Sequence, residues 1–197
     1  MKDRAIRFVR PGDARDAAGI LAIYAPFVRD TPVTFEYTVP SIEEFTKRIE
    51  GIASVYPYLV CERDGEILAY AYASRHMERA AYAWDVQTSV YAAPDARGTG
   101  VARALYASLF RLLEELGYCN AYAVIAVPNP RSERFHASFG FVPAGVHHKS
   151  GYKGGAWHDV AWMEKTLAPH ADTPVPPRPV TALDAAARER LLSPGIR

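Results

Sequence analysis

The sequence has few of the features that mark specialised protein classes. It contains only two cysteines, Cys61 and Cys119, in neither a CxxC nor a Cys/His metal spacing, which argues against a disulfide framework. No run approaches the roughly 18 consecutive apolar residues of a membrane span, and Met1–Arg10 lacks the apolar segment of a secretory signal. The formal net charge of +1 gives no electrostatic footprint for nucleic acid or an anionic membrane. We therefore expect a cytoplasmic protein with neither as a partner.

What is present suits an ordinary globular chain of 197 residues, of which 49% are hydrophobic and 23% charged. The composition changes near Leu167, because five prolines follow between Pro169 and Pro179 and cannot form a core. After them, residues 183–192 (LDAAARERLL) predict a short helix. We expect one domain over residues 1–167 and a proline-rich tail with a short helix over residues 168–197.

Inside the domain the hydrophobic period alternates between helix and strand, which predicts an α/β fold with a mixed sheet. Asp13 is an N-cap candidate, Ser41 and Glu44 form a capping box, and Gly117 stops the strongest helix. The predicted helices span about 13–27, 41–52, 101–116 and 131–139. The predicted strands span about 5–9, 58–62, 67–74, 82–91, 121–127, 142–148 and 159–165. The continuous apolar run 121–127 predicts a strand buried on both faces.

The segment from Val90 to Ala102 carries the clearest chemical signal. A strand ends, a turn with Gly98 and Gly100 follows, and the strongest helix begins. The N–H groups at a helix N-terminus suit a phosphate, and glycine allows close backbone approach. Arg97 adds positive charge to this turn. The segment therefore predicts a phosphate or pyrophosphate site.

Three phosphate-loop patterns compete for this turn. A Walker loop needs GK[ST], which is absent, and a Rossmann fingerprint needs a third glycine where Arg103 stands. The third pattern, Arg97-x-x-Gly100-x-Ala102, resembles the [QR]xxGx[GA] signature of acetyl-CoA binding in the GNAT superfamily of N-acetyltransferases. The plainer alternative is a loop with ordinary helix-capping glycines.

A second motif consists of Asn129, Ser132 and His136, whose spacings of three and four place them on one helical face. Asn129 follows a predicted central strand, where its side chain could meet an amide such as that of pantetheine. Ser132 could meet phosphate or amide oxygens. The plainer alternative makes Asn129 a helix cap and His136 a satisfied histidine.

Further motifs extend the likeness over residues 5–180. They are Asp64-Gly65-Glu66, Arg79-Ala-Ala-Tyr82-Ala-Trp84, Ser89-Val-Tyr91, Leu116-Gly117-Tyr118, Gly140-Phe141, Gly151-Tyr-Lys153 and Trp157-His-Asp-Val160. Together with the two motifs above, they resemble the phosphinothricin N-acetyltransferase family (bialaphos-resistance type) of the GNAT superfamily. This combination is more specific than any single motif.

The resemblance implies the GNAT fold, with a mostly antiparallel sheet, and acetyl transfer from acetyl-CoA. The acceptor it implies is the α-amine of a small anionic amino acid such as phosphinothricin, methionine sulfoximine or methionine sulfone. It implies no metal, and a homodimer. The implied coenzyme-binding residues are Val90, Tyr91 and Ala92 for the thioester and pantetheine, Arg97, Gly98, Thr99, Gly100, Val101 and Ala102 for the pyrophosphate, and Asn129 for the pantetheine arm. Ser132 is added to the coenzyme-binding set because it lies on the same helical face as Asn129.

One position departs from the family. Its general base is a glutamate four residues before the Tyr of the Val-Tyr pair, where this sequence has Gln87. A neutral amide cannot take a proton at pH 7. Asp85 projects to the same strand face and could act through a water, as could His136; otherwise the amine arrives deprotonated. His136 is also the candidate that reprotonates the leaving thiolate.

The acceptor pocket is predicted from weaker signals. Arg75, Arg79 and Lys153 could pair with a carboxylate or phosphinate, or be solvated surface charges. Phe35 and Tyr82 could line the pocket or fill the core, and core is the expectation for Trp157. His147, His148 and His158 lack metal-ligand spacing.

Two alternatives to an amino-acid acetyltransferase remain open. The first is an acetyltransferase for another acceptor, such as a polyamine or a protein N-terminus. The second is a coenzyme A-binding module whose catalysis lapsed with Gln87.

Overall fold

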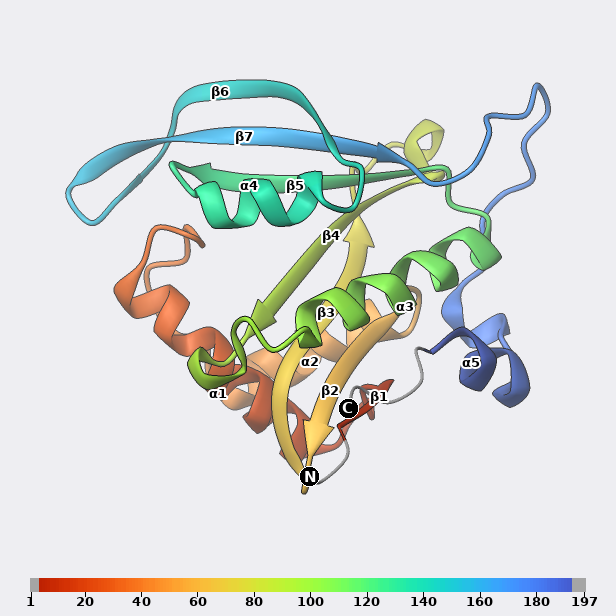
Figure 1. Cartoon of the computed structure of the whole chain (residues 1–197), viewed down its shortest axis with the longest axis horizontal. Coiled ribbons are helices and arrows are strands. Elements are labelled where there is room, and N and C mark those ends of the chain that lie inside the picture. The colour runs from red at the N-terminus through yellow and green to blue at the C-terminus, as the bar shows by residue number, and fades with distance from the viewer. Residues whose placement is uncertain (1–3, 193–197) are drawn as a thin grey trace.

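The computed structural model describes residues 4–192, so the last five residues of the expected tail lie outside it. One seven-stranded sheet, in the order β1-β2-β3-β4-β5-β7-β6, is flanked by helices (Figure 1). Its strands are β1 (Ala5–Phe8), β2 (Tyr58–Arg63), β3 (Glu66–Arg75), β4 (Asp85–Ala92), β5 (Asn120–Val127), β6 (Val142–Lys153) and β7 (Ala156–Thr166). The helices are α1 (Ala14–Asp30), α2 (Ile42–Ala53), α3 (Val101–Leu116), α4 (Pro130–Ala137) and α5 (Ala185–Leu191). Among the described residues, no helix combines the length and apolar character needed to cross a membrane.

The sheet is antiparallel except between β4 and β5, and this one parallel pairing is short. Only Asp85–Asn120, Val86–Ala121 and Gln87–Tyr122 are in register. Beyond Gln87 the two strands diverge, and Figure 1 shows β4 running away from β5. The expected mixed, mostly antiparallel sheet is confirmed, and the divergence leaves an opening in its middle.

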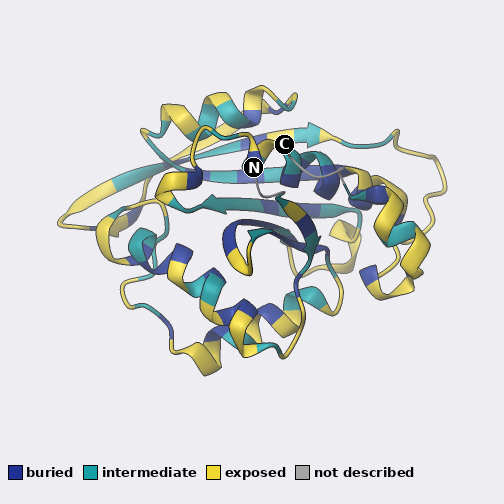
Figure 2. Cartoon of the chain, turned by 60° about the horizontal axis from the view of Figure 1, so that its bottom comes forward, coloured by how far each residue is buried: buried dark blue, intermediate teal, exposed yellow. Residues whose placement is uncertain are grey.

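Helices cover the two faces of the sheet unequally. Helices α1 and α2 pack against β2 and β3 around Ile20, Phe45 and Tyr70, whereas α3 packs on the opposite face around Leu105 and Leu109. Figure 2 shows buried residues along the sheet and on the inner sides of the helices. Strand β6 has exposed residues from 142 to 150, so this end of the sheet is open to solvent.

The helix boundaries follow the expected caps. Asp13 accepts a hydrogen bond from the Arg15 N–H at the start of α1, and Ser41 Oγ accepts one from the Glu44 N–H at the start of α2. Helix α3 begins after Gly100 and ends at Gly117, with φ of 88° and 93°. These backbone conformations favour glycine, which explains why the predicted limits of this helix hold.

Three strand expectations need correction. The strand expected from Tyr82 begins only at Asp85, because residues 80–82 form a 3₁₀ turn. Strand β5 is not buried on both faces, since buried and half-buried residues alternate along it. The expected strand 142–148 continues to Lys153, and its partner begins at Ala156, because Gly154 and Gly155, with φ of 62° and 79°, form the connecting turn. The Gly-Gly pair was the overlooked hairpin signal.

The tail packs on the domain. Val180, Leu183 and Leu191 are buried in the core beside α3. The Arg178 N–H donates to the Leu116 carbonyl, and the Val180 N–H donates to the Val55 carbonyl. The boundary near residue 167 remains a prediction, but the described part of the tail shares the core of the residues before it.

Both cysteines are buried free thiols. Burial raises the pKa of Cys61 to about 11, so its thiol stays protonated at neutral pH. Neither thiol lies in the motifs described above.

Candidate active site

The divergence of β4 from β5 forms a cleft of about 680 Å³. Strand β4 supplies its wall from Thr88 to Ala92, and β5 supplies the opposite wall from Ala123 to Ala126. The loop before α3 and helix α4, from Arg131 to His136, complete the lining. Ten expected site residues line the cleft: Val90, Tyr91, Ala92, Arg97, Gly98, Gly100, Ala102, Asn129, Ser132 and His136.

The backbone of β4 presents donors to this cleft. The Ala93 N–H donates to the Leu68 carbonyl on β3, at 2.9 Å. Because N–H groups alternate in direction along a strand, the N–H groups of Val90 and Ala92 point away from β3, toward the side that β5 has left. An acyl oxygen placed between the strands can therefore accept hydrogen bonds from β4.

The loop before α3 has the geometry of an anion site. Gly98 and Gly100 have φ of 79° and 88°, and an added Cβ at either would meet no protein atom within 4 Å. Protein packing therefore does not fill the space beside these glycines. The first N–H groups of α3 lie at this end of the cleft, where a phosphate gains from both the free donors and the helix dipole.

Two of the expected loop residues place their side chains elsewhere. Val101, the first residue of α3, is 1% exposed and packs in the core. Thr99 Oγ1 donates to the Ala96 carbonyl at 2.7 Å. Their side chains do not line the cleft, so any contact with a ligand there is left to their backbone groups.

Positive charge gathers at this cleft more than the sequence motifs indicated. Four arginines line it: Arg97, Arg103, Arg131 and Arg134. From the sequence, only Arg97 was expected to bind a ligand. Arg131 and Arg134 could have been recognised as further candidates, because they lie on either side of Ser132. Four guanidinium groups suit a polyanion such as a nucleotide with several phosphates.

Helix α4 brings Asn129, Ser132 and His136 together, as their spacing predicted. Asn129 caps the helix by accepting from the Ser132 N–H at 3.2 Å. His136 is 5% exposed, and its Nδ1 lies 2.8 Å from the Ser132 carbonyl. Burial lowers the pKa of His136, which keeps the imidazole neutral at neutral pH.

The second ring nitrogen of His136 contacts a residue that the sequence analysis missed. Its Nε2 lies 3.1 Å from the hydroxyl of Tyr106, which in turn lies 3.4 Å from Thr88 Oγ1. Both nitrogens of His136 are therefore engaged, and it presents no free nitrogen to a thiolate in this arrangement. Tyr106 lies in the helix predicted over residues 101–116, and hydrophobic periodicity does not reveal the partner of a buried hydroxyl.

At the closed end of the cleft, Asp85 and Gln87 lie on the same face of β4, as expected. Gln87 pairs with Ser74 on β3 and Tyr122 on β5. Asp85 Oδ1 accepts from Asn120 Nδ2 at 2.9 Å. Neither side chain lines the cleft itself, because the first cleft residue of β4 is Thr88.

Lys153 is not a free cation. Its ammonium is bound to the carbonyls of Val28 and Thr34, at 2.7 Å each, and the residue is 8% exposed. The contact with Val28 joins the β6–β7 hairpin to the last turn of α1, and the contact with Thr34 joins it to the segment after α1. These contacts contradict the expectation that Lys153 pairs with an acceptor anion and give it a structural role.

Phe35 belongs to the same junction. Its ring covers Gly151, where an added Cβ would lie 2.1 Å from a ring carbon. Nearby, the Tyr37 hydroxyl donates to the Tyr152 carbonyl. The segment after α1 is thus docked on the hairpin, and Phe35 marks where the two meet.

Arg75 lies on the α3 face of the sheet, opposite the face of Asp85 and Gln87. It pairs with Val86, which is buried on the α3 face, and its guanidinium lies 3.0 Å from Glu78. Arg79 is exposed between β3 and β4, and Tyr82, 42% exposed, follows in the same segment. Their place in the acceptor pocket therefore remains a prediction.

Three further histidines and Trp157 are on the β6–β7 hairpin. His148 contacts Asp159 at 2.9 Å, and His158 Nε2 lies 2.9 Å from the Lys153 carbonyl. His147 packs beside Trp162, with ring centroids 5.6 Å apart. Trp157 is 61% exposed, so the expectation that it fills the core is wrong.

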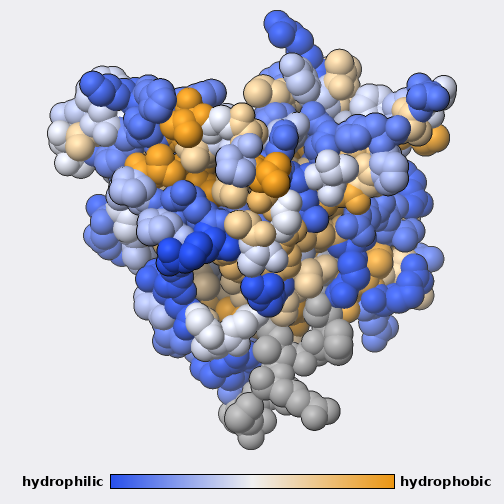
Figure 3. Space-filling model, turned by 45° about the horizontal axis from the view of Figure 1, so that its top comes forward, coloured by the Kyte–Doolittle hydropathy of each residue, from blue (hydrophilic) through white to orange (hydrophobic). Residues whose placement is uncertain are grey.

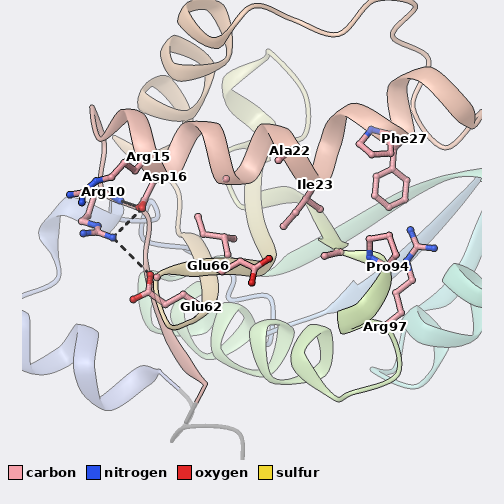
Figure 4. A pocket seen from close by; sticks show the side chains of 15 residues that line it. Arg10, Arg15, Asp16, Ala22, Ile23, Phe27, Glu62, Glu66, Pro94 and Arg97 are labelled. Carbon is pink, nitrogen blue, oxygen red and sulfur yellow. Dashed lines mark hydrogen bonds and ion pairs between the residues drawn. The ribbon is translucent and has the colours of Figure 1, made fainter. Parts of the chain in front are cut away.

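A second groove, of about 540 Å³, adjoins the cleft through Phe27 and Arg97, which line both (Figure 4). The Arg97 guanidinium lies 5.5 Å from the centroid of the Phe27 ring. At the other end, Figure 4 shows Arg10 joined to Asp16 and Glu62. Asp16 also pairs with Arg7 at 2.6 Å, so the acidic charge here is neutralised within the protein.

Comparisons with known proteins agree with this geometry. Residues 6–162 match the Acetyltransferase (GNAT) domain family. A phosphinothricin N-acetyltransferase of Streptomyces coelicolor is 41% identical over 163 residues, covering 81% of this chain and 95% of the relative. An L-methionine sulfoximine/L-methionine sulfone acetyltransferase of Salmonella typhimurium is 29% identical, covering 83% of this chain and 96% of the relative.

A solved structure gives the same result for the fold. The crystal structure of a GNAT phosphinothricin acetyltransferase from Sinorhizobium meliloti, in complex with acetyl-CoA, has a TM-score of 0.82 and 34% identity, covering 89% of this chain and 94% of that one. The diverging strands, the glycine loop and the match over most of the chain therefore show that this protein belongs to the GNAT family of acetyltransferases.

Proposed function

We propose that this protein transfers the acetyl group of acetyl-CoA to the α-amine of a small anionic amino acid, of the class of phosphinothricin and methionine sulfoximine or sulfone. The observation that carries the proposal is the cleft between β4 and β5, with an open glycine loop and four arginines. Relatives named for these acceptors support the substrate class.

The residues of the cleft suit the parts of the coenzyme. The Gly98–Gly100 loop and Arg97 would hold the pyrophosphate at the N-terminus of α3. Asn129 and Ser132 lie where they would contact the pantetheine arm. The other arginines of the cleft would neutralise the remaining phosphate charge.

The chemistry that follows is direct attack of a neutral amine on the thioester. The N–H groups of Val90 and Ala92 would donate to the thioester oxygen as it gains negative charge. Because the strand already holds these donors in place, they need no reorganisation during the reaction. The carbon–nitrogen bond forms, the carbon–sulfur bond breaks, and no residue is acylated. Both ring nitrogens of His136 are occupied by Ser132 and Tyr106. We therefore assign His136 the role of holding α4 against α3 beside the cleft.

A second candidate has one observation in its favour. Gln87 stands where the family's general base is expected, and an amide cannot accept a proton. A coenzyme-binding protein without catalysis is therefore the alternative, along with an enzyme for another acceptor such as a polyamine. The exposed Arg79 favours an anionic acceptor over a polycation.

One experiment separates these functions. The purified protein is incubated with acetyl-CoA and a panel of amino acids, amino-acid sulfones and polyamines, and free thiol is followed. Turnover restricted to anionic amino acids supports the proposal. Coenzyme binding measured by calorimetry, with no turnover on any amine, supports the binding module instead.

We also propose that the chain forms a homodimer in the cytoplasm, without nucleic acid or membrane as partner. The exposed apolar side chains of β6 and its hairpin, Val142, Val146, Tyr152 and Trp157, support a protein contact at this end of the sheet. Figure 3 shows hydrophobic patches in the upper part of the face that it displays. Light scattering on the purified protein tests the dimer, and a monomer would exclude it.

A further inference from the structure

His76 lies beside the position where the family's general base is expected. It directly follows β3, whose last residue, Arg75, pairs with Val86. Continuing this antiparallel register by one residue places His76 next to Asp85, on the same sheet face as Gln87. Diagonal neighbours of this kind in a sheet are about 7–8 Å apart at their Cα atoms, within reach of long and aromatic side chains.

The ring of His76 is held on that face by aromatic neighbours. It stacks on Tyr122, with centroids 4.1 Å apart and planes 11° apart. Tyr122 is the register partner of Gln87 on β5, so the imidazole lies over the residue next to Gln87. Trp162 and Tyr82 approach it edge-on, at 5.6 and 6.3 Å.

The hydrogen bonding of His76 is incomplete. Its Nδ1 is buried without a hydrogen-bond partner among the described residues, and so is Trp162 Nε1. A buried polar atom without a partner costs stability, and such atoms in native proteins often belong to functional groups. The structural role of a ring that only packs on Tyr122 would be served by phenylalanine, which has no such atom.

The electrostatic surroundings keep this imidazole available as a base. Burial lowers the pKa of His76, and the nearby Asp85 carboxylate opposes that shift. Around it, the rings of Tyr122 and Tyr82 pack against the imidazole, Glu164 pairs with Tyr122 in the sheet, and His147 packs beside Trp162. A neutral imidazole with a carboxylate nearby can take up a proton, and the carboxylate then faces the new positive charge.

We propose that His76 accepts the proton of the acceptor's ammonium group, in place of the carboxylate that Gln87 does not supply. This inference rests on the proposed acetyl transfer. In the reaction, one proton passes from the ammonium to His76 and later to solvent. The free amine attacks the thioester carbon, the carbon–sulfur bond breaks, and a second proton leaves the nitrogen and ends on the sulfur of coenzyme A.

The test compares His76→Phe with wild type and with His147→Phe. Phenylalanine keeps the stack on Tyr122 but removes the base, and His147 is a matched histidine on the other side of Trp162. A positioned general base contributes roughly 10²–10⁴-fold, so kcat should fall by that order in His76→Phe while the KM for acetyl-CoA and coenzyme affinity stay unchanged. His147→Phe should keep wild-type kcat.

The pH profile gives an independent readout. In wild type, kcat/KM should fall at acidic pH as His76 becomes protonated. In His76→Phe the limb set by His76 should disappear, and kcat/KM should instead keep rising through neutral pH as more of the acceptor becomes a free amine. Adding Gln87→Glu to His76→Phe should restore most of kcat, because the carboxylate replaces the lost base.

The outcomes are distinguishable. The assignment of His76 is overturned if the wild type turns over, the kcat of His76→Phe stays within twofold of wild type, and the acidic limb of its pH profile is unchanged. Absence of turnover in wild type on every amine overturns the proposed function instead. If His76→Phe does not bind coenzyme or fold, His76→Gln, which keeps a planar polar group over Tyr122, is measured in the same way, and the same criteria apply.

Discussion

Tyr106 and His136 come from different helices, and the Tyr106 hydroxyl lies 3.1 Å from His136 Nε2. Because Nδ1 of the neutral ring donates to the Ser132 carbonyl, Nε2 is the acceptor and the Tyr106 hydroxyl is the donor. This bond joins α3 to α4 on one side of the cleft. Both residues are almost fully buried, so water does not compete for either group.

Tyr106→Phe should therefore lower stability and slow acetyl transfer. The change leaves the buried Nε2 of His136 without a partner, which costs about 1–3 kcal/mol in the free energy of unfolding. Denaturant unfolding measures the stability, and kcat is expected to fall more than the KM for acetyl-CoA rises. Tyr118→Phe, at another buried tyrosine, is the control; equal effects of both changes would remove the special role of Tyr106.

The lowered pKa of His136 predicts how stability depends on pH. The ordinary pKa of 6.5 applies to the unfolded chain, and burial depresses the folded-state pKa. Between these two values the unfolded chain binds more protons, so stability is lost as pH falls below about 6.5. Denaturant unfolding at several pH values measures this slope. His136→Gln should reduce it, and an unchanged slope would contradict the buried neutral state.

Gly100→Val should weaken coenzyme binding at least tenfold. A β-branched residue is strained at the φ of 88°, and its side chain would enter the open space beside the loop. Calorimetry with acetyl-CoA measures the loss. Gly154→Val is the matched control, because Gly154 also has a positive φ and no neighbour within 4 Å but lies in the β6–β7 turn. Unchanged affinity in Gly100→Val would exclude this loop from the site.

Removing residues 181–197 should destabilise the protein without removing the catalytic residues. All cleft residues precede the tail, so the truncation leaves the lining of the cleft in place. The structure adds that Leu183 and Leu191 are buried, and burying such a side chain contributes about 1.5–3 kcal/mol. The truncated chain should melt at a lower temperature yet keep its KM values while folded. A folded truncation without activity would show that the tail shapes the cleft.

Local chemistry in the sequence predicted the parts of the fold that depend on near neighbours. The limits of α3 follow from Gly100 and Gly117, and the cap of α4 follows from Asn129 and Ser132. The phosphate loop was recognisable for the same reason, since its glycines and Arg97 lie within four residues of one another. A pattern of adjacent residues is sufficient where the backbone itself forms the site.

Contacts between distant segments could not be predicted in this way. Lys153 was read as an anion-binding residue, but its partners are backbone carbonyls 125 and 119 residues earlier, which no side-chain pattern reveals. The sheet face of Arg75 depends on the strand register, here with Val86, which a local pattern does not give. The predicted range of β6 ended too early, at residue 148. The strand is exposed over residues 142–150, so it lacks the alternation of buried and exposed residues that marks a half-buried strand.

Phe35 docks on Gly151, and this contact predicts that the hairpin contributes to the acceptor side of the site; one methyl group tests the prediction. In Gly151→Ala the new Cβ would lie 2.1 Å from a Phe35 ring carbon, so the ring and its segment after α1 must move. We expect the KM for the amino-acid acceptor to rise several-fold and stability to fall by about 1–3 kcal/mol, the usual cost of overpacking. The KM for acetyl-CoA should not change, because the coenzyme loop is on other elements.

Gly145→Ala is the matched control on the same strand, since an added Cβ there meets nothing within 4 Å. If Gly151→Ala matches this control in acceptor KM, the segment carrying Phe35 does not form part of the acceptor pocket.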